Sequence, residues 1–172
     1  MAKVLIMASD GFEQSELFVP LEKLKNAGHD VEIAAPEAGE IKAWDKKDWG
    51  KSVSASKAIS DVDAGSYDAL VLPGGVINPD NLRQDQKAIA LIRSFAKAGK
   101  PVAAICHAPW LLAEAGLAQG RRLTSYASIR TDMRNAGAEV VDEQVVVDRG
   151  IITSRNPDDL DAFVGAIEEA LA

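Results

Sequence analysis

The sequence predicts an α/β fold in which helices cover both faces of a mainly parallel sheet. Short apolar runs rich in β-branched residues alternate along the chain with longer segments of helical periodicity. The short runs are continuously apolar, as in strands buried on both faces. Hydrophobic residues make up 47% of the 172 residues and charged residues 26%, which is the composition of an ordinary globular domain. We therefore expect a single domain spanning residues 1–172.

The expected elements follow one another in a regular order. Strands are predicted at residues 4–8, 31–35, 69–72 and 102–105, and two more within 145–154 on either side of a turn at 148–150. Helices are predicted around Leu17, Leu21 and Leu24 up to a stop at Gly28, and then at 84–98, after Cys106, at 128–136 and at 158–171. Residues 37–60, which include Trp44 and Trp49, interrupt this order and indicate a small hairpin insertion. Strand–helix alternation implies right-handed crossovers, so the architecture is a flavodoxin-like three-layer sandwich.

Charge and cysteine content exclude several classes of partner. The chain has 19 basic and 26 acidic side chains, giving a net charge of −7, which disfavours both nucleic acid and an anionic membrane surface as partners. The single cysteine fits a reducing compartment. The N-terminal apolar run at residues 4–8 is shorter than the core of a signal peptide. We expect a cytoplasmic protein with no membrane segment.

Three of the predicted strands end in residues suited to chemistry. Residues 9–13 follow the first strand, 73–76 the third and 105–109 the fourth. Binding sites of such sheets form outside the carboxyl ends of the strands. If these strands are neighbours, Glu13, the backbone of Gly74 and Gly75, and Cys106 meet in one pocket.

Cys106 stands where an apolar strand turns into a helix, the geometry of a nucleophile elbow. The helix end favours the thiolate form of a cysteine at this position, which suits a nucleophile. The alternative interpretation is a buried cysteine that acts only as a small hydrophobe. The chain has two histidines, and His29 lies in a predicted turn, so a cysteine–histidine pair within the chain would be Cys106 with His107. Adjacent residues at a helix start point in different directions, so His107 reaches the sulfur only if the elbow is strongly twisted.

Glu13 is the candidate acid of the predicted pocket. Two anions are not both stable in a partly desolvated pocket, so Glu13 would keep its proton, hydrogen-bond Cys106 and transfer a proton to or from a substrate. The amides of Gly75 and Val76 are candidate oxyanion donors, although a double glycine is also a common tight turn. No phosphate-binding loop, dinucleotide fingerprint or metal-ligand cluster occurs, so no cofactor or metal is expected.

Four segments resemble the PfpI-type intracellular protease family, within the superfamily of the parkinsonism-associated protein deglycase and its class I glutamine amidotransferase-like fold. They are residues 9–13, 68–75, 104–109 and 153–160, and they occur in the family's order. The resemblance implies Cys106 as the elbow nucleophile, Glu13 as its acidic partner, the amides of Gly75 and Val76 as oxyanion donors, and a catalytic role for His107.

The resemblance also implies self-association, as a homodimer or a hexamer. In family peptidases a carboxylate from a neighbouring subunit pairs with this histidine and completes a catalytic triad. Asp80 occupies the position of that carboxylate here, in place of a longer glutamate. Ala108 and Trp110 replace the family's Gly and Gln, and we expect Trp110 to narrow the pocket.

The leading hypothesis is a cysteine-dependent stress-response hydrolase, a glyoxalase- or deglycase-like enzyme. Its thiolate would attack small reactive carbonyls or their adducts on proteins. The first alternative is an intracellular cysteine peptidase assembled across subunits, with unfolded protein as substrate. The second is a non-catalytic redox sensor or chaperone that uses oxidation of Cys106.

Overall fold

The computed structural model describes residues 1–172 and has a seven-stranded central sheet in the order β11-β12-β8-β7-β1-β3-β6. All neighbouring pairs are parallel except β11 with β12. The strands are β1 (Lys3–Met7), β3 (Asp30–Ala35), β6 (Lys57–Ala58), β7 (Ala69–Leu72), β8 (Val102–Ile105), β11 (Val146–Asp148) and β12 (Ile151–Ser154). The predicted mainly parallel α/β class is confirmed.

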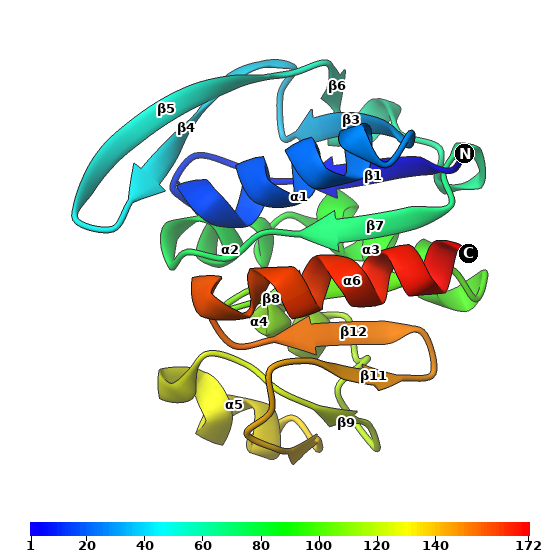
Figure 1. Cartoon of the computed structure of the whole chain (residues 1–172). Helices are drawn as coiled ribbons and strands as arrows, with labels where there is room; N and C mark the ends of the chain where they lie inside the picture. Colours follow the sequence, from blue (N-terminus) through cyan, green and yellow to red (C-terminus); the bar gives the residue numbers. More distant parts are fainter.

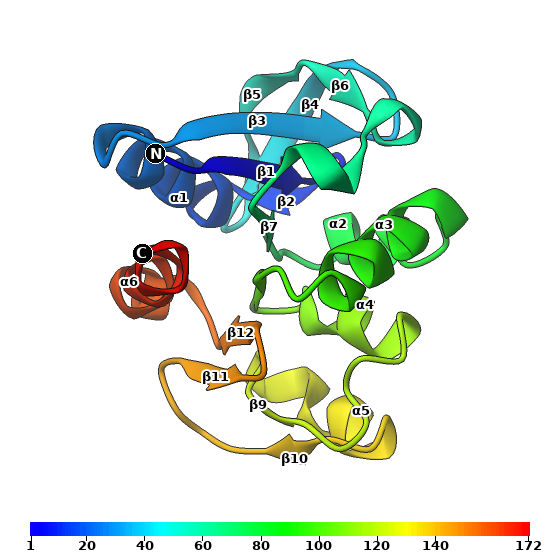
Figure 2. The same cartoon turned by 90° about the vertical axis from the view of Figure 1, so that its right-hand side faces the viewer.

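Helices cover both faces of this sheet (Figures 1 and 2). On one face lie α1 (Gln14–Asn26) and α6 (Leu160–Leu171), and on the other α2 (Ile77–Leu82), α3 (Gln86–Lys97) and α4 (Pro109–Glu114). Side chains alternate between faces along a strand. Val4 and Ile6 of β1 therefore pack in the core under α1 and α6, whereas Leu5 and Met7 pack in the core under α3 and α4. These two cores make the three-layer arrangement. None of the helices combines the length and hydropathy that a membrane span requires.

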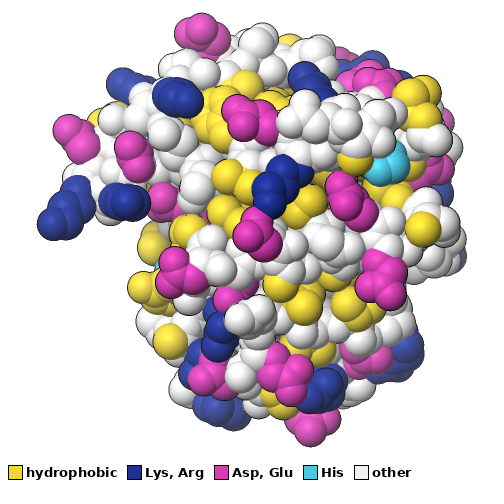
Figure 3. Space-filling view, viewed as in Figure 1, with side chains coloured by type: hydrophobic (Ala, Val, Ile, Leu, Met, Phe, Trp, Pro, Cys, Tyr) yellow, Lys and Arg dark blue, Asp and Glu magenta, His cyan; other side chains and the backbone are white.

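The predicted insertion is a long hairpin that projects from the sheet (Figure 1). It consists of β4 (Gly39–Asp45) and β5 (Asp48–Ala55), and β4 also pairs in parallel with the short β2 (Phe12–Glu13). Ile41 and Ala43 bury the base of the hairpin in the core. Figure 3 shows charged side chains of both signs on its projecting end. The base of the hairpin is therefore packed in the core, whereas its tip is exposed to solvent.

The remaining elements lie at the β11 edge of the sheet or in connections. A two-stranded parallel sheet, β9 (Arg122–Leu123) with β10 (Glu139–Val140), packs beside α5 (Arg130–Asn135) and was not predicted. Short 3-10 helices occupy η1 (Ile59–Asp61), η2 (Ala64–Ser66), η3 (Ala127–Ile129) and η4 (Pro157–Asp159). Strands β9 and β10 have only two residues each, which is too short for an alternating hydrophobic pattern to show in the sequence.

Candidate active site

Cys106 occupies a strained turn between β8 and α4. Its φ angle is +66°, a left-handed backbone conformation that costs a residue with a side chain about 1–3 kcal/mol. The surrounding backbone holds this conformation, because the Cys106 N–H donates to the Ser154 carbonyl (3.1 Å) and the Cys106 carbonyl accepts from the Tyr126 N–H (2.8 Å). The predicted elbow between strand and helix is therefore present at Cys106, which is 6% exposed.

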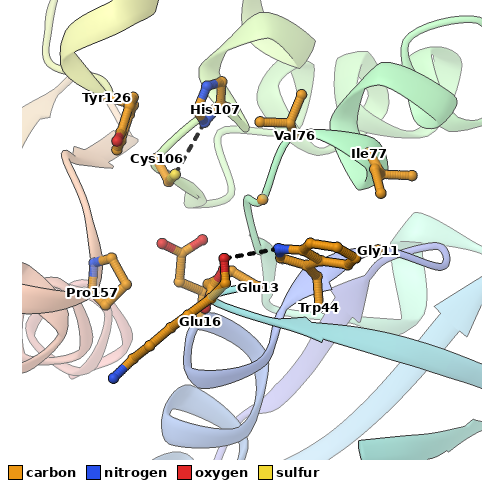
Figure 4. Close-up of a pocket in the computed structure, with 12 residues that line it drawn as sticks. Gly11, Glu13, Glu16, Trp44, Val76, Ile77, Cys106, His107, Tyr126 and Pro157 are labelled. Atoms are coloured by element: carbon orange, nitrogen blue, oxygen red, sulfur yellow. Dashed lines mark hydrogen bonds between the residues drawn. The ribbon is translucent and has the colours of Figure 1, made fainter. Parts of the chain in front are cut away.

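The elbow opens into a pocket of about 500 Å³ at the carboxyl ends of β1, β7 and β8 (Figure 4). These three strands are neighbours, so the predicted convergence of their ends is present. The pocket is lined by Gly11, Glu13, Glu16, Trp44, Lys46, Gly75, Val76, Ile77, Cys106, His107, Tyr126 and Pro157. Cys106 and His107 lie on the side opposite Glu13 and Glu16. One thiol, one imidazole and two carboxyl groups thus share a single cavity.

The two glycines after β7 are required for different reasons. A Cβ at Gly74 would lie 2.5 Å from the Ile105 carbonyl oxygen and 2.6 Å from the Cys106 Cβ, closer than real contacts allow. Gly75 has a φ of +79°, and a Cβ there would lie 2.6 Å from the Gly11 carbonyl oxygen. Glycine at both positions lets the β7 turn approach the nucleophile directly.

The carboxyl group beside Cys106 is that of Glu16, and the assignment of this contact to Glu13 is wrong. Glu16 is fully buried, and its Oε1 accepts a hydrogen bond from the Gly74 N–H (2.9 Å). Its other oxygen, Oε2, is buried with no protein hydrogen-bond partner. The carboxyl group interacts with the Cys106 side chain, and burial raises its pKa to about 8, with the charge of Glu13 adding to the increase. Glu16 is therefore protonated at neutral pH.

Helix periodicity explains why the partner is three residues further along than expected. Helix α1 begins at Gln14 and buries Glu16, Leu17, Pro20 and Leu24 on one stripe. Glu13 precedes the helix and is only half-buried at the pocket wall. A carboxyl group placed on an apolar helical stripe was a signal in the sequence, because an ionisable side chain is rarely buried without a function or a partner.

Glu13 nevertheless belongs to the pocket. Burial raises its pKa above the ordinary value, while a hydrogen bond from the Lys46 backbone lowers it. Glu13 also pairs with Trp44 through the β2–β4 ladder, so it stands where the hairpin meets the pocket. Its position suits contact with a substrate rather than with the sulfur.

The thiol of Cys106 is not stabilised as an anion in the way the sequence suggested. Burial raises its pKa above the ordinary value, and the neighbouring Glu16 raises it further, although the Gly75 amide opposes the rise. Helix α4 has only six residues, so its dipole offers little compensation. At neutral pH the Cys106 thiol and the Glu16 carboxyl are therefore both protonated.

His107 does reach the sulfur, because the positive φ at Cys106 twists the elbow. Its Nδ1 lies 3.2 Å from the Cys106 Sγ. The ring stacks on Tyr126 with a centroid distance of 4.6 Å, and burial lowers its pKa, so the imidazole is neutral at neutral pH. The other histidine, His29, accepts a hydrogen bond from the Ala2 N–H far from this pocket.

The structure reverses the expected roles of two tryptophans. Trp110 does not line the pocket: its indole N–H donates to Asp132 (2.9 Å), and its ring meets the back of His107 edge-on at 5.2 Å. Trp44, from the hairpin, forms part of the pocket wall instead. The sequence predicted the hairpin only as an insertion, so its contribution to the site was missed.

The remaining predicted site residues lie in or near the pocket. Gly75 lines the pocket together with Cys106, so its amide remains a candidate oxyanion donor, and Val76 lies at the rim and is 54% exposed. Asp80 is exposed on α2 and makes no hydrogen bond to His107 within the chain. No three His, Cys, Asp or Glu side chains gather closely enough to hold a metal ion.

An elbow cysteine facing a protonated glutamate at the strand ends of a flavodoxin-like sheet defines a class of thiol-dependent α/β proteins. The chain belongs to the DJ-1/PfpI family, whose family model matches residues 2–170. The resemblance seen in the sequence is thereby confirmed.

Relatives and solved structures agree with this membership. The chain is 44% identical to "Deglycase TK1284" of Thermococcus kodakarensis over 94% of this chain and 95% of the relative. It is 43% identical to "Protein/nucleic acid deglycase 2" of Escherichia coli over 94% of this chain and 92% of the relative. The crystal structure of Drosophila melanogaster DJ-1beta superposes with a TM-score of 0.91 at 31% identity, covering 99% of this chain and 90% of that one.

Proposed function

We propose that this chain is a cysteine-dependent stress-response hydrolase that acts on small reactive carbonyls or on their adducts with proteins. The observation that carries the proposal is the arrangement of the Cys106 thiol, the buried Glu16 carboxyl and the Gly75 backbone around one cavity, with Glu16 held there by the Gly74 N–H. These groups supply a nucleophile, a transferable proton and an oxyanion donor in one cavity. The two relatives named as deglycases support the same class of reaction.

The chemistry begins with addition of sulfur to a carbonyl carbon. The S–C bond forms as the C=O electron pair moves onto oxygen, next to the Gly75 amide, and this oxygen then takes up a proton. With methylglyoxal, moving the aldehyde hydrogen to the neighbouring carbon as a proton and adding water releases lactate and the free thiol. With a methylglyoxal adduct, the amine or thiol that carried the adduct leaves as well. Glu16 is placed to carry the protons that these steps transfer.

The pocket wall favours a small substrate with a polar extension. The pocket has a volume of about 500 Å³, and the carboxyl group of Glu13 and the ammonium group of Lys46 line it near the hairpin. A peptidase would require in addition a carboxylate on His107, and the candidate is Asp80 of a second copy. A redox sensor would require only the thiol and Glu16. The net charge of −7 disfavours nucleic-acid adducts, so we place protein adducts first.

We further propose a cytoplasmic homo-oligomer, with a dimer as the minimum. Val76 and Ile77, which line the pocket, are 54% and 39% exposed, and Trp49 of the hairpin, which contacts Trp44, is 45% exposed. A second copy of the chain would remove them from water. Sedimentation at micromolar concentration should show at least a dimer, and a species of one chain only would reject the assembly.

The test of the proposed activity compares the protein with Cys106→Ala. Each is incubated with methylglyoxal, a methylglyoxal-treated protein, a methylglyoxal-treated nucleotide and an unfolded protein, while lactate, restored amines and cleaved peptides are measured. We expect lactate or restored amines only with the intact thiol. Equal activity of Cys106→Ala would reject covalent catalysis, thiol-dependent cleavage of the unfolded protein would favour the peptidase, and a well-folded enzyme inert on all four would favour the redox sensor.

A further inference from the structure

The outer nitrogen of His107 has a partner within the same chain. While Nδ1 faces the Cys106 Sγ at 3.2 Å, Nε2 lies 3.4 Å from the Ser128 Oγ. The two ring nitrogens are therefore both engaged, one by the nucleophile and one by a hydroxyl group from a distant part of the sequence. Neither the motifs around the elbow nor the chemistry proposed above uses Ser128.

The backbone ties Ser128 to the elbow. The Tyr126 N–H donates to the Cys106 carbonyl (2.8 Å), and the Ile129 N–H donates to the Tyr126 carbonyl (3.1 Å) across η3. Ile129 is buried in a small core with Met133 beneath this turn. Ser128 itself is exposed, so this anchoring, and not burial of its side chain, holds the hydroxyl opposite the imidazole.

Two aromatic rings fix the orientation of the imidazole. Tyr126 stacks on His107 with 25° between the ring planes, and Trp110 meets it edge-on with 68° between the planes. Trp110 is in turn held by Asp132 through its indole N–H. The ring cannot rotate freely, so the side of the imidazole that faces Ser128 is set by the fold.

We propose that Ser128 is a positioning residue that selects the tautomer of His107 able to accept the Cys106 proton. A neutral imidazole carries one N–H. If Nε2–H donates to the Ser128 oxygen, Nδ1 has a free lone pair toward the thiol and acts as a base. When Nδ1 takes the proton, Nε2–H keeps the same hydrogen bond. Ser128 therefore supports both protonation states of the Cys106–His107 pair without rearrangement. This role deepens the proposed function, and its effect on turnover rests on that function.

The same contact bears on the role of Asp80. Nε2 is the nitrogen that a carboxylate from a second copy would need, because Nδ1 faces the sulfur. With Ser128 on Nε2, the cysteine–histidine pair is complete within one chain. A neutral hydroxyl stabilises an imidazolium less than a carboxylate does, so His107 holds the proton only transiently.

Nitrogen NMR of the imidazoles tests the proposal directly, because the chain has only two histidines and His29 serves as the internal reference. In the intact protein at neutral pH, we expect His107 to show a protonated Nε2 and an unprotonated Nδ1. Ser128→Ala should give a mixture of tautomers, and Ser128→Thr, which keeps the hydroxyl, should restore one. Ser94→Ala removes a hydroxyl on α3 that bonds only within its own helix, so it should change nothing.

Turnover of methylglyoxal provides the second measurement. Loss of one neutral hydrogen bond in Ser128→Ala should lower kcat roughly five- to tenfold with little change in KM, and Ser128→Thr should recover it. An unchanged tautomer in Ser128→Ala would overturn the proposal, as would a tautomer that shifts in Asp80→Asn instead. If the intact protein turns over no carbonyl, the proposed function fails, while the NMR comparison still decides the role of Ser128.

Discussion

The pocket has two walls that differ in how strongly the fold constrains them. The wall at the strand ends is closely packed: Gly74 has no room for a Cβ, Glu16 is fully buried and Cys106 is held at a positive φ. The wall from the β4–β5 hairpin, formed by Trp44 and Lys46, is more open: Trp49, which packs on Trp44, is 45% exposed. We infer from this difference that the chemistry takes place at the first wall and that the second wall influences which substrates enter.

The contrast predicts its largest effect at Gly74. Gly74→Ala brings a methyl group into overlap with a carbonyl oxygen, the Cys106 Cβ and a Glu16 oxygen, so we expect a loss of more than about 3 kcal/mol of unfolding free energy. Urea unfolding measures it. The matched control is Gly165→Ala, on α6, where nothing lies within 4 Å of the added Cβ. That change should stabilise the helix by about 0.5–1 kcal/mol. Similar stabilities of the two variants would show that the glycine turn is not tightly packed.

The pH dependence of stability should single out Glu16. Its pKa is about 8 in the folded protein against 4.5 for an unperturbed glutamate, so the folded state holds the proton more tightly. Stability from this group is fully present below pH 4.5 and is lost as the pH rises toward 8. Glu16→Gln has no such loss. Between pH 5 and pH 8 its unfolding free energy should therefore rise by on the order of 3 kcal/mol relative to that of the native chain. Parallel stability curves for the two proteins would contradict a protonated buried carboxyl.

The smallest effect is expected at the hairpin tip. Trp49 contacts Trp44 edge-on, with 5.4 Å between ring centroids, but much of its surface faces solvent. Trp49→Ala should change the unfolding free energy of the monomer by less than about 1 kcal/mol. Thermal unfolding at low protein concentration measures this. A loss above about 2 kcal/mol would place the tip within the cooperative core and remove the contrast between the walls.

Much of the fold was predictable because its strands are buried on both faces. The runs at residues 4–8, 69–72 and 102–105 are continuously apolar, and they form the central strands β1, β7 and β8. Their adjacency then placed the pocket at the correct strand ends. The two-residue strands β9 and β10 could not be predicted, because backbone pairing of that length leaves no periodic signal.

The site was predictable at the elbow and less so around it. Cys106 was found because a strand runs directly into a helix at that residue, but the contact with His107 depends on a positive φ that sequence does not show. Glu13 was chosen because it immediately follows the predicted strand and loop, and Glu16 was not considered. The phase of α1 decides between them, and Pro20 obscured where that helix begins. Trp44 and Ser128 reach the pocket region through tertiary packing alone.

We propose that Glu16, and not Glu13, is the carboxyl group beside Cys106 that carries protons to and from the substrate. The measurement is methylglyoxal turnover for Glu16→Gln and Glu13→Gln, set beside the pH dependence of Cys106 alkylation by iodoacetamide. Glutamine keeps the shape and a hydrogen-bond donor but has no transferable proton. Glu16→Gln should lower turnover by roughly 10²–10⁴-fold while alkylation persists, and Glu13→Gln should stay within about threefold of the native enzyme. Normal turnover by Glu16→Gln, or an equal loss in Glu13→Gln, would contradict this role of Glu16.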